Sequence, residues 1–184
     1  MAAVDDHPVA LHNLRQMLQE SPHNIELVAS AGSVAALLAG PGRHADVVLL
    51  DLLLPEEPDV VANIGRLQAA GPRVVIFTSD SRPAVVRSAI EAGALALVLK
   101  GDPESRMTEA ILTAQTGEFS VSSRLAHAIV TDPAVATRLS ADEQEVLTMV
   151  AHGLPHKLIA RRLGIAADMI TPHLRRIVRG YARR

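Results

Sequence analysis

Over residues 1–118, short apolar runs alternate with longer stretches in which apolar residues recur every three or four positions. The short runs have the length of strands, and the spacing in the longer stretches is typical of helices that bury one face. Strands that alternate with helices favour βαβ units and a parallel sheet. We therefore predict an α/β fold with a five-stranded, doubly wound parallel sheet. The predicted strands are 2–5, 25–29, 46–50, 73–77 and 94–99, and the predicted helices are 8–20, 33–39, 58–70, 83–92 and 104–116.

Residues 139–184 carry helical patterns only. Ser140 followed by Glu143 is a capping box, which marks the start of a helix. Gly153 ends that helix, a second one is expected over 155–163, and Gly164 makes the turn into a third. A helix, a glycine turn and a helix of this size form a helix-turn-helix pattern. We predict a small all-α helix-turn-helix domain here.

Three parts follow from these patterns. They are a domain over 1–118, a linker over 119–138 with a short helix near 121–130, and the helical domain over 139–184. The charge divides along the same boundaries. Residues 1–118 hold 8 Lys/Arg and 15 Asp/Glu, whereas residues 139–184 hold 8 and 4. An acidic first domain with a basic last one is expected when only the last part meets a polyanion such as DNA.

Composition excludes several classes of protein. The 184-residue chain has no cysteine, so disulfides and thiolate metal sites are ruled out. Aromatic residues make up only 2%, and the core must be built from Ala, Val, Leu and Ile. No apolar run approaches the ~20 residues that a membrane helix needs, and the N-terminus does not resemble a secretion signal. We expect a cytoplasmic protein that does not bind membranes.

Polar residues stand at the end of four of the predicted strands. Asp5 and Asp6 end the first, Asp51 ends the third, Thr78 follows the fourth and Lys100 ends the fifth. The carboxyl ends of parallel strands share one edge of a doubly wound sheet, where binding sites form. The pattern therefore predicts a divalent-metal site around an acid that accepts a phosphoryl group. The alternative is that these residues only cap helices, as Asp and Thr commonly do.

These residues, in this order, resemble the receiver domain of two-component response regulators, a flavodoxin-like fold. The matching pieces are Val4-Asp5-Asp6-His7-Pro8, Asp51-Leu52-Leu53-Leu54-Pro55, Thr78, and Lys100 followed by glycine. The resemblance implies that Asp51 is the phosphoacceptor and that a sensor histidine kinase is the partner. It also implies that Asp6, Asp51 and the backbone carbonyl of Leu53 ligate Mg²⁺, with Asp5 acting through water. Oxygen ligands of this kind suit Mg²⁺.

Residues 139–179 resemble the LuxR-type DNA-binding domain, and a receiver followed by this domain is typical of the NarL/FixJ class. The resemblance implies a DNA-binding transcription regulator that acts as a homodimer. The residues that carry it are Leu139-Ser140, Glu145-Val146-Leu147, Gly153-Leu154, Lys157, Ile159–Ile165, Ile170, His173, Leu174 and Ile177. The residues expected to contact DNA are Lys157, Thr171, His173, Arg175, Arg176 and Arg179.

The chain departs from that family at several positions. Pro172 falls about five residues into the expected DNA-reading helix, where proline deletes a hydrogen bond and clashes one turn back. The helix is predicted to kink there or to begin afresh with Thr171 as its cap, which would leave DNA affinity mostly electrostatic. In the family, an aromatic residue that couples phosphorylation to output occupies the position of Leu97. The family also continues into a fourth helix that supports dimerisation, and that helix is not expected here, where the sequence ends with 180–184. Dimerisation is then expected through residues 83–116 or the linker helix.

These departures leave an alternative function open: a receiver-driven protein-interaction regulator whose degenerate helix-turn-helix does not read DNA specifically or works without phosphorylation. An enzyme is not expected. Phosphatases that use a nucleophilic Asp place a second acid two residues later, where this chain has Leu53. A Walker loop, a Ser-His-Asp order and a metal-binding His pair are also missing from the sequence.

Overall fold

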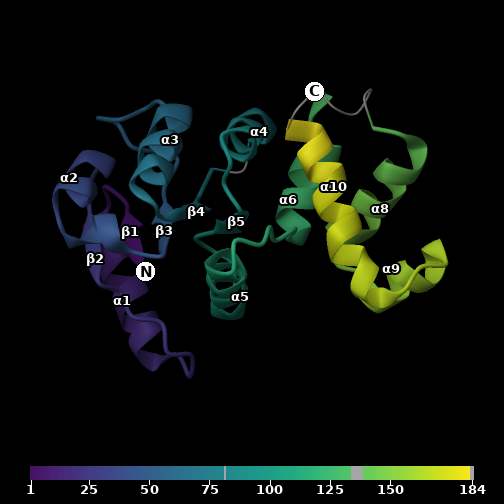
Figure 1. Cartoon of the computed structure of the whole chain (residues 1–184), viewed down its shortest axis with the longest axis horizontal. Coiled ribbons are helices and arrows are strands. Elements are labelled where there is room, and N and C mark those ends of the chain that lie inside the picture. The colour runs from purple at the N-terminus through teal and green to yellow at the C-terminus, as the bar shows by residue number, and fades with distance from the viewer. Residues whose placement is uncertain (81, 134–138, 183–184) are drawn as a thin grey trace.

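The computed structural model describes residues 1–80, 82–133 and 139–182. Its first domain is built on a parallel sheet whose strands lie in the order β2-β1-β3-β4-β5 (Figure 1). This arrangement confirms the predicted doubly wound α/β fold. The strands are β1 (Ala2–Val4), β2 (Ala29–Ala31), β3 (Val47–Leu50), β4 (Arg73–Thr78) and β5 (Ala96–Leu99).

One strand was misplaced by the sequence pattern. The apolar residues at 25–29 predicted a strand there, but β2 begins only at Ala29 and pairs with β1 through Ala31. Ile25 and Leu27 instead pack as partly buried side chains against the core. Before β2 the backbone bonds to Met1, whose amino group donates to the Glu26 carbonyl at 2.7 Å and whose carbonyl accepts from the Val28 N–H at 2.9 Å. The apolar pattern marked contact with the core rather than strand pairing.

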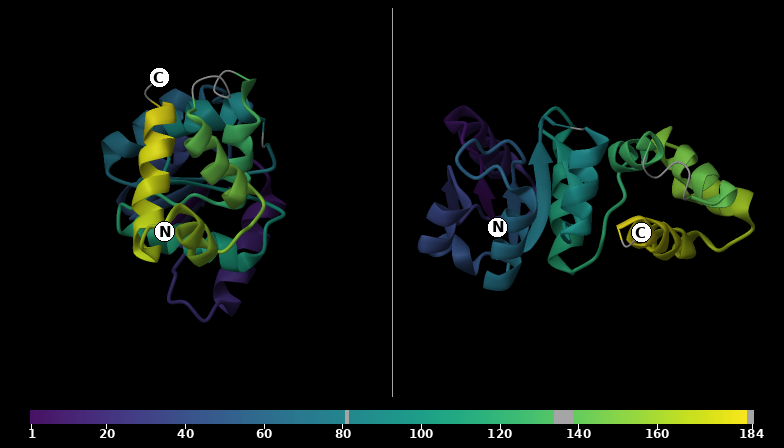
Figure 2. Two further views of the ribbon diagram at one scale, coloured as in Figure 1. Left: turned by 90° about the vertical axis from the view of Figure 1, so that its right-hand side faces the viewer. Right: turned by 90° about the horizontal axis from the view of Figure 1, so that it is seen from above.

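The helices cover both faces of the sheet (Figure 2). Alternate strand residues such as Leu49 and Val75 pack with α1 and α5 on one face, while Leu50 and Ile76 pack with α2, α3 and α4 on the other. The helices of this domain are α1 (Pro8–Glu20), α2 (Val34–Ala39), α3 (Val60–Ala70), α4 (Pro83–Glu91) and α5 (Glu104–Gln115), with a short 3-10 helix, η1 (Pro41–His44).

The C-terminal part contains the predicted helix-turn-helix. Its elements are α6 (Ser123–Val130) in the linker, α8 (Ala141–Ala151), α9 (His156–Leu163), the 3-10 helix η2 (Ala167–Met169) and α10 (Ile170–Ala182). The capping box of Ser140 and Glu143 starts α8 as predicted. Gly164 ends α9 with a left-handed backbone (φ 66°), a conformation that favours glycine.

Pro172 does not kink the DNA-reading helix in its middle. The expected helix is divided, with η2 covering its first residues and α10 starting afresh at Ile170. Pro172 is therefore the third residue of α10, in the first turn, where a backbone N–H would have no acceptor within the helix. The predicted restart is confirmed, but it comes one residue before Thr171, which is the second helical residue rather than the cap.

The linker helix α6 joins the two domains into one packed body. Its buried residues Leu125 and Ile129 belong to the same apolar cluster as Leu97 of β5 and Val146 of α8. In the packing, α6 contacts β5, α4 and α8, and α10 also contacts α4. The α4–β5 part of the surface expected to mediate dimerisation is thus covered by the chain itself (Figures 1 and 2). None of the described helices is long and apolar enough to cross a membrane.

Candidate functional site

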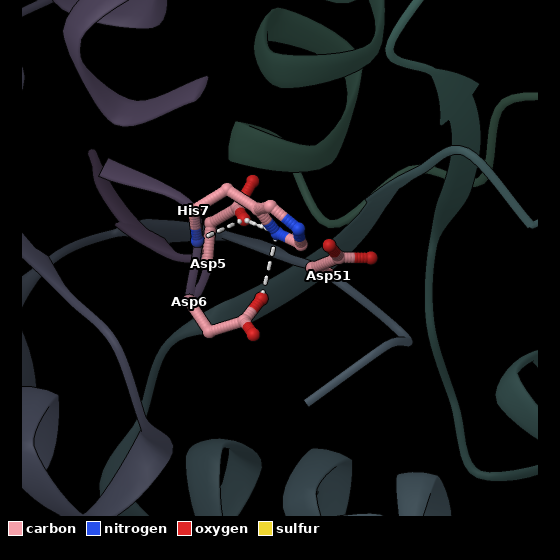
Figure 3. Close-up of side chains that lie close together, drawn as sticks. All are labelled: Asp5, Asp6, His7 and Asp51. Carbon is pink, nitrogen blue, oxygen red and sulfur yellow. Dashed lines mark hydrogen bonds and ion pairs between the residues drawn. The ribbon is translucent and has the colours of Figure 1, made fainter. Parts of the chain in front are cut away.

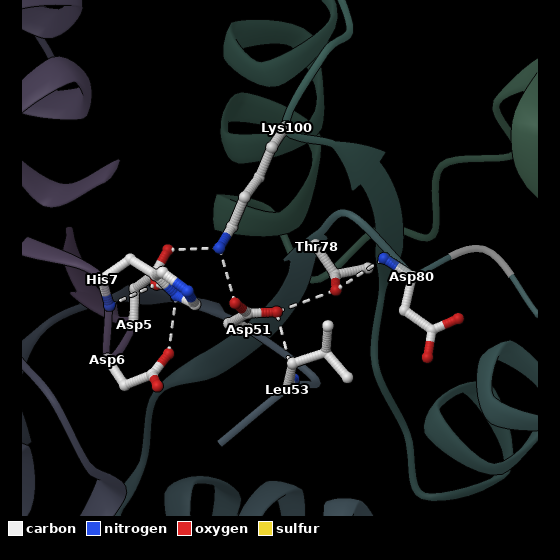
Figure 4. A network of polar contacts seen from close by, with 8 residues as sticks. All are labelled: Asp5, Asp6, His7, Asp51, Leu53, Thr78, Asp80 and Lys100. Carbon is white, nitrogen blue, oxygen red and sulfur yellow. Dashed lines mark hydrogen bonds and ion pairs between the residues drawn. The ribbon is translucent and has the colours of Figure 1, made fainter. Parts of the chain in front are cut away.

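Four of the predicted site residues meet at the carboxyl edge of the sheet (Figure 4). Asp5 follows β1, Asp51 follows β3, Thr78 is the last residue of β4 and Lys100 follows β5. Asp5, Asp51 and Thr78 are buried, with exposed fractions of 3%, 2% and 0%. Buried carboxylates are stable only when cations or hydrogen-bond donors face them, so their partners define the site.

Asp51 lies at the centre of this site. Its Oδ1 accepts hydrogen bonds from the Thr78 hydroxyl at 2.8 Å and from the Leu53 N–H at 3.1 Å. Its Oδ2 accepts from Lys100 Nζ at 2.5 Å. Both carboxylate oxygens are therefore held by donors from three separate segments, which fixes the orientation of Asp51.

Lys100 bridges the two buried carboxylates. Its Nζ lies 2.7 Å from Asp5 Oδ2 and 2.5 Å from Asp51 Oδ2. Burial alone would lower the pKa of Lys100, but the hydrogen bonds to Asp5 and Asp51 outweigh burial and raise that pKa above its usual value. Lys100 is thus held in its charged form next to the acid that it is predicted to assist.

Asp6 lies on the open side of the site, beside His7 (Figure 3). His7 Nδ1 is 2.8 Å from Asp6 Oδ1 and 3.2 Å from Asp5 Oδ1. Sequence analysis placed His7 in a motif but did not expect its ring to fold back onto the acids. The only signal for this was its position directly after Asp5 and Asp6 and before a helix that starts with Pro8.

The donor set fits a magnesium ion. Asp5, Asp6, His7 and Asp51 each offer a ligand atom, and these atoms all lie within 4.8 Å of one another. Three of the four are carboxylates, which is the chemistry that Mg²⁺ prefers. Leu53, whose carbonyl is expected to complete the set, is 43% exposed between two buried leucines.

The loop after Thr78 adds a pair that sequence analysis missed. The Asp80 N–H donates to Thr78 Oγ1 at 3.1 Å. The Asp80 carboxylate turns toward Arg82, whose Nη2 lies 2.6 Å away. Hydrogen bonds from the Arg82 side chain lower the pKa of Asp80 against the opposing effect of burial. The segment that leads into α4 is thereby tied to the hydroxyl that contacts Asp51.

The residues expected to contact DNA divide between two sides of the helical domain. Lys157 on α9 is exposed, and His173 and Arg176 on α10 line an open hollow, with Arg176 Nη2 3.3 Å from His173 Nδ1. Thr171 instead lines a cavity of about 280 Å³ between the two domains. Arg175 lies on that same side. The side chain of Arg179 is outside the described residues.

Arg175 is bound to the last residue of the first domain in this arrangement. Its Nη2 lies 3.3 Å from Glu118 Oε2, and its side chain is 25% exposed. The α10 helix also packs against α4 of the first domain. Two of the predicted DNA-contacting residues, Thr171 and Arg175, therefore face the first domain rather than open solvent.

Comparison with known proteins agrees with this geometry. Residues 1–112 match the response regulator receiver domain, and residues 137–179 match the bacterial regulatory proteins of the luxR family. The nitrate/nitrite response regulator protein NarP of Escherichia coli is 30% identical over 96% of this chain and 85% of its own length. The probable transcriptional regulatory protein NarL of Mycobacterium tuberculosis is 29% identical over 94% and 83%.

Solved structures show the same architecture. The response regulator ChrA of a heme-sensing two-component system is 30% identical, with a TM-score of 0.61 over 94% of this chain and 85% of that one. The RcsB response regulator of Salmonella typhimurium shares the fold at 21% identity, with a TM-score of 0.61 over 96% and 89%.

The chain belongs to the response regulators, because the receiver domain matches more than half of its length. The LuxR-type domain that follows makes it a DNA-binding regulator of a two-component system. The recognition made from the sequence motifs is confirmed, and the DNA-binding function is favoured over the protein-interaction alternative.

Proposed function

We propose that Asp51 is phosphorylated by a sensor histidine kinase and that this modification controls DNA binding by the helical domain. The observation that supports this most directly is the buried Asp51 carboxylate, held by Thr78 and by the charged Lys100. A carboxylate oxygen of Asp51 attacks the phosphorus of the donor, and the bond from phosphorus to its former carrier breaks. The product is an acyl phosphate on Asp51.

The other residues of the site serve this transfer electrostatically. Asp6, Asp51 and the Leu53 carbonyl would hold Mg²⁺, and Asp5 would act through a water molecule. Mg²⁺ held by these residues would neutralise charge on the transferring phosphoryl group. The Lys100 ammonium would have the same effect from its position at Asp51 Oδ2, and the Thr78 hydroxyl donates to Asp51 Oδ1. Positioned charges of this kind are the main contribution that a protein makes to phosphoryl transfer.

DNA contacts are assigned to Lys157, Thr171, His173, Arg175, Arg176 and Arg179, and we infer that the chain acts as a homodimer on DNA in the cytoplasm. Contacts from Arg and Lys to phosphates position a protein without reading the sequence. Because Arg175 is bound to Glu118 and α10 packs on α4, the arrangement described here holds part of this surface against the receiver. Phosphorylation at Asp51 is proposed to release it.

A mass measurement tests the phosphorylation site. The protein is incubated with acetyl phosphate and Mg²⁺, and we expect a mass increase of one phosphate that disappears when Mg²⁺ is chelated. Asp51→Asn should abolish the increase. Asp46→Asn is the matched control, because Asp46 is an exposed aspartate at the opposite end of the same strand. Undiminished labelling of Asp51→Asn would exclude Asp51 as the acceptor.

A further inference from the structure

Glu57 occupies an unusual position in the loop that follows Asp51. The loop over 52–58 leads from the end of β3 to α3, and it carries the Leu53 carbonyl proposed as a metal ligand. Glu57 is 23 residues from Val34 in sequence, yet its side chain reaches the start of α2. That side chain is only 14% exposed, although glutamate is usually on the surface.

The carboxylate of Glu57 binds two separate helices. Oε2 accepts from the Val34 N–H at 2.5 Å, and Oε1 accepts from the Ala35 N–H at 3.2 Å. Oε1 also accepts from Arg66 Nη1 of α3 at 2.8 Å. Burial opposes the charged form of Glu57, but the hydrogen bonds from Arg66, Val34 and Ala35 together lower its pKa. Hydrogen bonds to an ionised group are roughly twice as strong as neutral ones.

The backbone of Glu57 is fixed as well. Its N–H donates to the Leu54 carbonyl at 3.1 Å, which closes a turn with Pro55 at the second position. Its own carbonyl accepts from Asn63 Nδ2 at 2.7 Å, and Asn63 is only 4% exposed. Side chain and backbone therefore anchor the far end of the loop, while the chain leaving β3 anchors its near end at Asp51.

Leu53 lies between these two anchors. Leu52 and Leu54 are buried, whereas the Leu53 side chain is 43% exposed, and the Leu53 N–H donates to Asp51 Oδ1 at 3.1 Å. Within the described residues, Glu57 is the one charged side chain of the loop with partners outside it, because the neighbouring Glu56 is exposed and makes no ion pair or hydrogen bond. The Leu53 peptide is therefore held by Asp51 on one side, and the Glu57 anchor limits the path of the loop on the other.

We propose that Glu57 is a positioning residue for the metal site: by tying the loop to α2 and α3, it holds the Leu53 carbonyl where Mg²⁺ can be bound. The inference rests on the proposed function of the Asp51 site, which it deepens. Outer partners that orient metal ligands typically change metal affinity by about 10- to 100-fold when they are removed. Glu57 touches neither the metal nor the phosphoryl group.

Calorimetric titration of the full-length protein with Mg²⁺ tests this inference. We expect Glu57→Gln to weaken Mg²⁺ binding about tenfold, because the neutral amide presents an N–H₂ group to the α2 donors and loses the charge that binds Arg66. Glu56→Gln is the matched control, since it removes the same charge from the adjacent residue and should change the affinity by less than about twofold. Arg66→Gln should give an intermediate loss.

A second readout separates positioning from general stability. Hydrogen exchange should become faster at the amides of 52–56 in Glu57→Gln, while the sheet amides of β3 and β4 keep their protection. Phosphate uptake from acetyl phosphate should recover when Mg²⁺ is raised about tenfold, because only metal affinity is impaired. Arg66→Gln carries the same test if the Glu57 variant does not fold.

The outcomes distinguish this inference from the proposed function. Mg²⁺ affinity within about twofold of wild type in folded Glu57→Gln would overturn the role of Glu57, even if Asp51 is phosphorylated normally. Normal Mg²⁺ binding by wild type without phosphate uptake would overturn the proposed function, and the calorimetric comparison would still decide the role of Glu57. Wild-type protein that binds no Mg²⁺ would overturn both.

Discussion

The Arg175 guanidinium, on the helix assigned to DNA, lies 3.3 Å from the Glu118 carboxylate at the end of the first domain. Arg175 Nε is buried and has no hydrogen-bond partner among the described residues, so Glu118 supplies the negative charge for this side chain. A DNA phosphate would supply the same kind of partner. A phosphate would compete with Glu118 for this side chain, so the pair links the docked position of α10 to DNA affinity.

Removing the charge of Glu118 should therefore favour DNA binding by unphosphorylated protein. Both side chains are partly exposed, at 25% and 53%, and exposed ion pairs contribute about 0.2–1 kcal/mol. We expect Glu118→Gln to raise DNA affinity by up to about fivefold in fluorescence anisotropy at fixed salt. Glu109→Gln is the control, because Glu109 lines the same cavity but pairs with Arg106. Equal effects of the two variants would show that net charge alone is responsible.

Most of the fold could be predicted because helices and strands leave local patterns in the sequence. The apolar periods placed nine of the ten predicted elements of the first domain, and the capping box of Ser140 and Glu143 placed the start of α8. The Asp51 site followed because strand ends of a parallel sheet must meet. The predicted position of β2 was wrong because Ile25 and Leu27 are apolar residues that pack against the core without belonging to a strand.

Other features of the site lie outside what local patterns reveal. The ring of His7 turns back onto Asp5 and Asp6, and Glu57 reaches α2 across 23 residues. These contacts depend on the three-dimensional path of loops, which carry no periodic signal. The packing of α10 on α4 could not be predicted either, because neither helix carries a sequence pattern that identifies the other as its partner.

The ion pair between Arg87 and Asp132 should control access to the α4–β5 surface. Arg87 Nη1 lies 3.3 Å from Asp132 Oδ2, and the Asp132 side chain is only 4% exposed. Arg87→Glu would place like charges together at this buried position, so α6 should leave α4. We expect the variant to self-associate more strongly than wild type in sedimentation velocity without a phosphodonor. Arg15→Glu, at an exposed position of α1 outside residues 83–116, should sediment as wild type. An unchanged mass for Arg87→Glu would argue against dimerisation through α4 and β5.

Lys100 binds the Asp5 and Asp51 carboxylates, for which we expect it to compete with Mg²⁺. Lys100→Met would leave the buried Asp5 and Asp51 without their cation, which costs stability when metal is absent. We expect a lower unfolding temperature without Mg²⁺ and a larger increase on adding Mg²⁺ than in wild type, since a ligand that binds only the folded state stabilises it. Phosphate uptake at saturating Mg²⁺ should be slower. Lys157→Met removes an exposed lysine on α9 and should leave all three measurements unchanged.

Glu57 should also affect how the free energy of unfolding decreases at acid pH. Its pKa is lower in the folded protein than in the unfolded chain. Its stabilising contribution is therefore fully present above the unfolded value of about 4.3 and is lost as the pH falls through the lower folded value. Glu57→Gln should reduce stability at pH 7 and flatten the decline below about pH 4.3, as measured by urea unfolding at several pH values. Glu56→Gln should keep the wild-type slope.

Pro172 gives the sharpest test of how the helical domain meets DNA. It lies in the first turn of α10 and lines the same open hollow as His173 and Arg176. No intrahelical hydrogen bond is lost there, so Pro172→Ala should change stability by less than about 1 kcal/mol. Pro172→Lys adds a cation to the exposed basic side.

One added phosphate contact should raise DNA affinity and steepen the dependence of log K on log salt by about 0.9. Pro172→Ala is the matched control for loss of the proline and should leave that slope unchanged. If Pro172→Lys also raises the preference for an inverted repeat over random DNA, the first turn of α10 reads bases. An unchanged salt slope for Pro172→Lys would mean that the side bearing His173 and Arg176 does not face DNA.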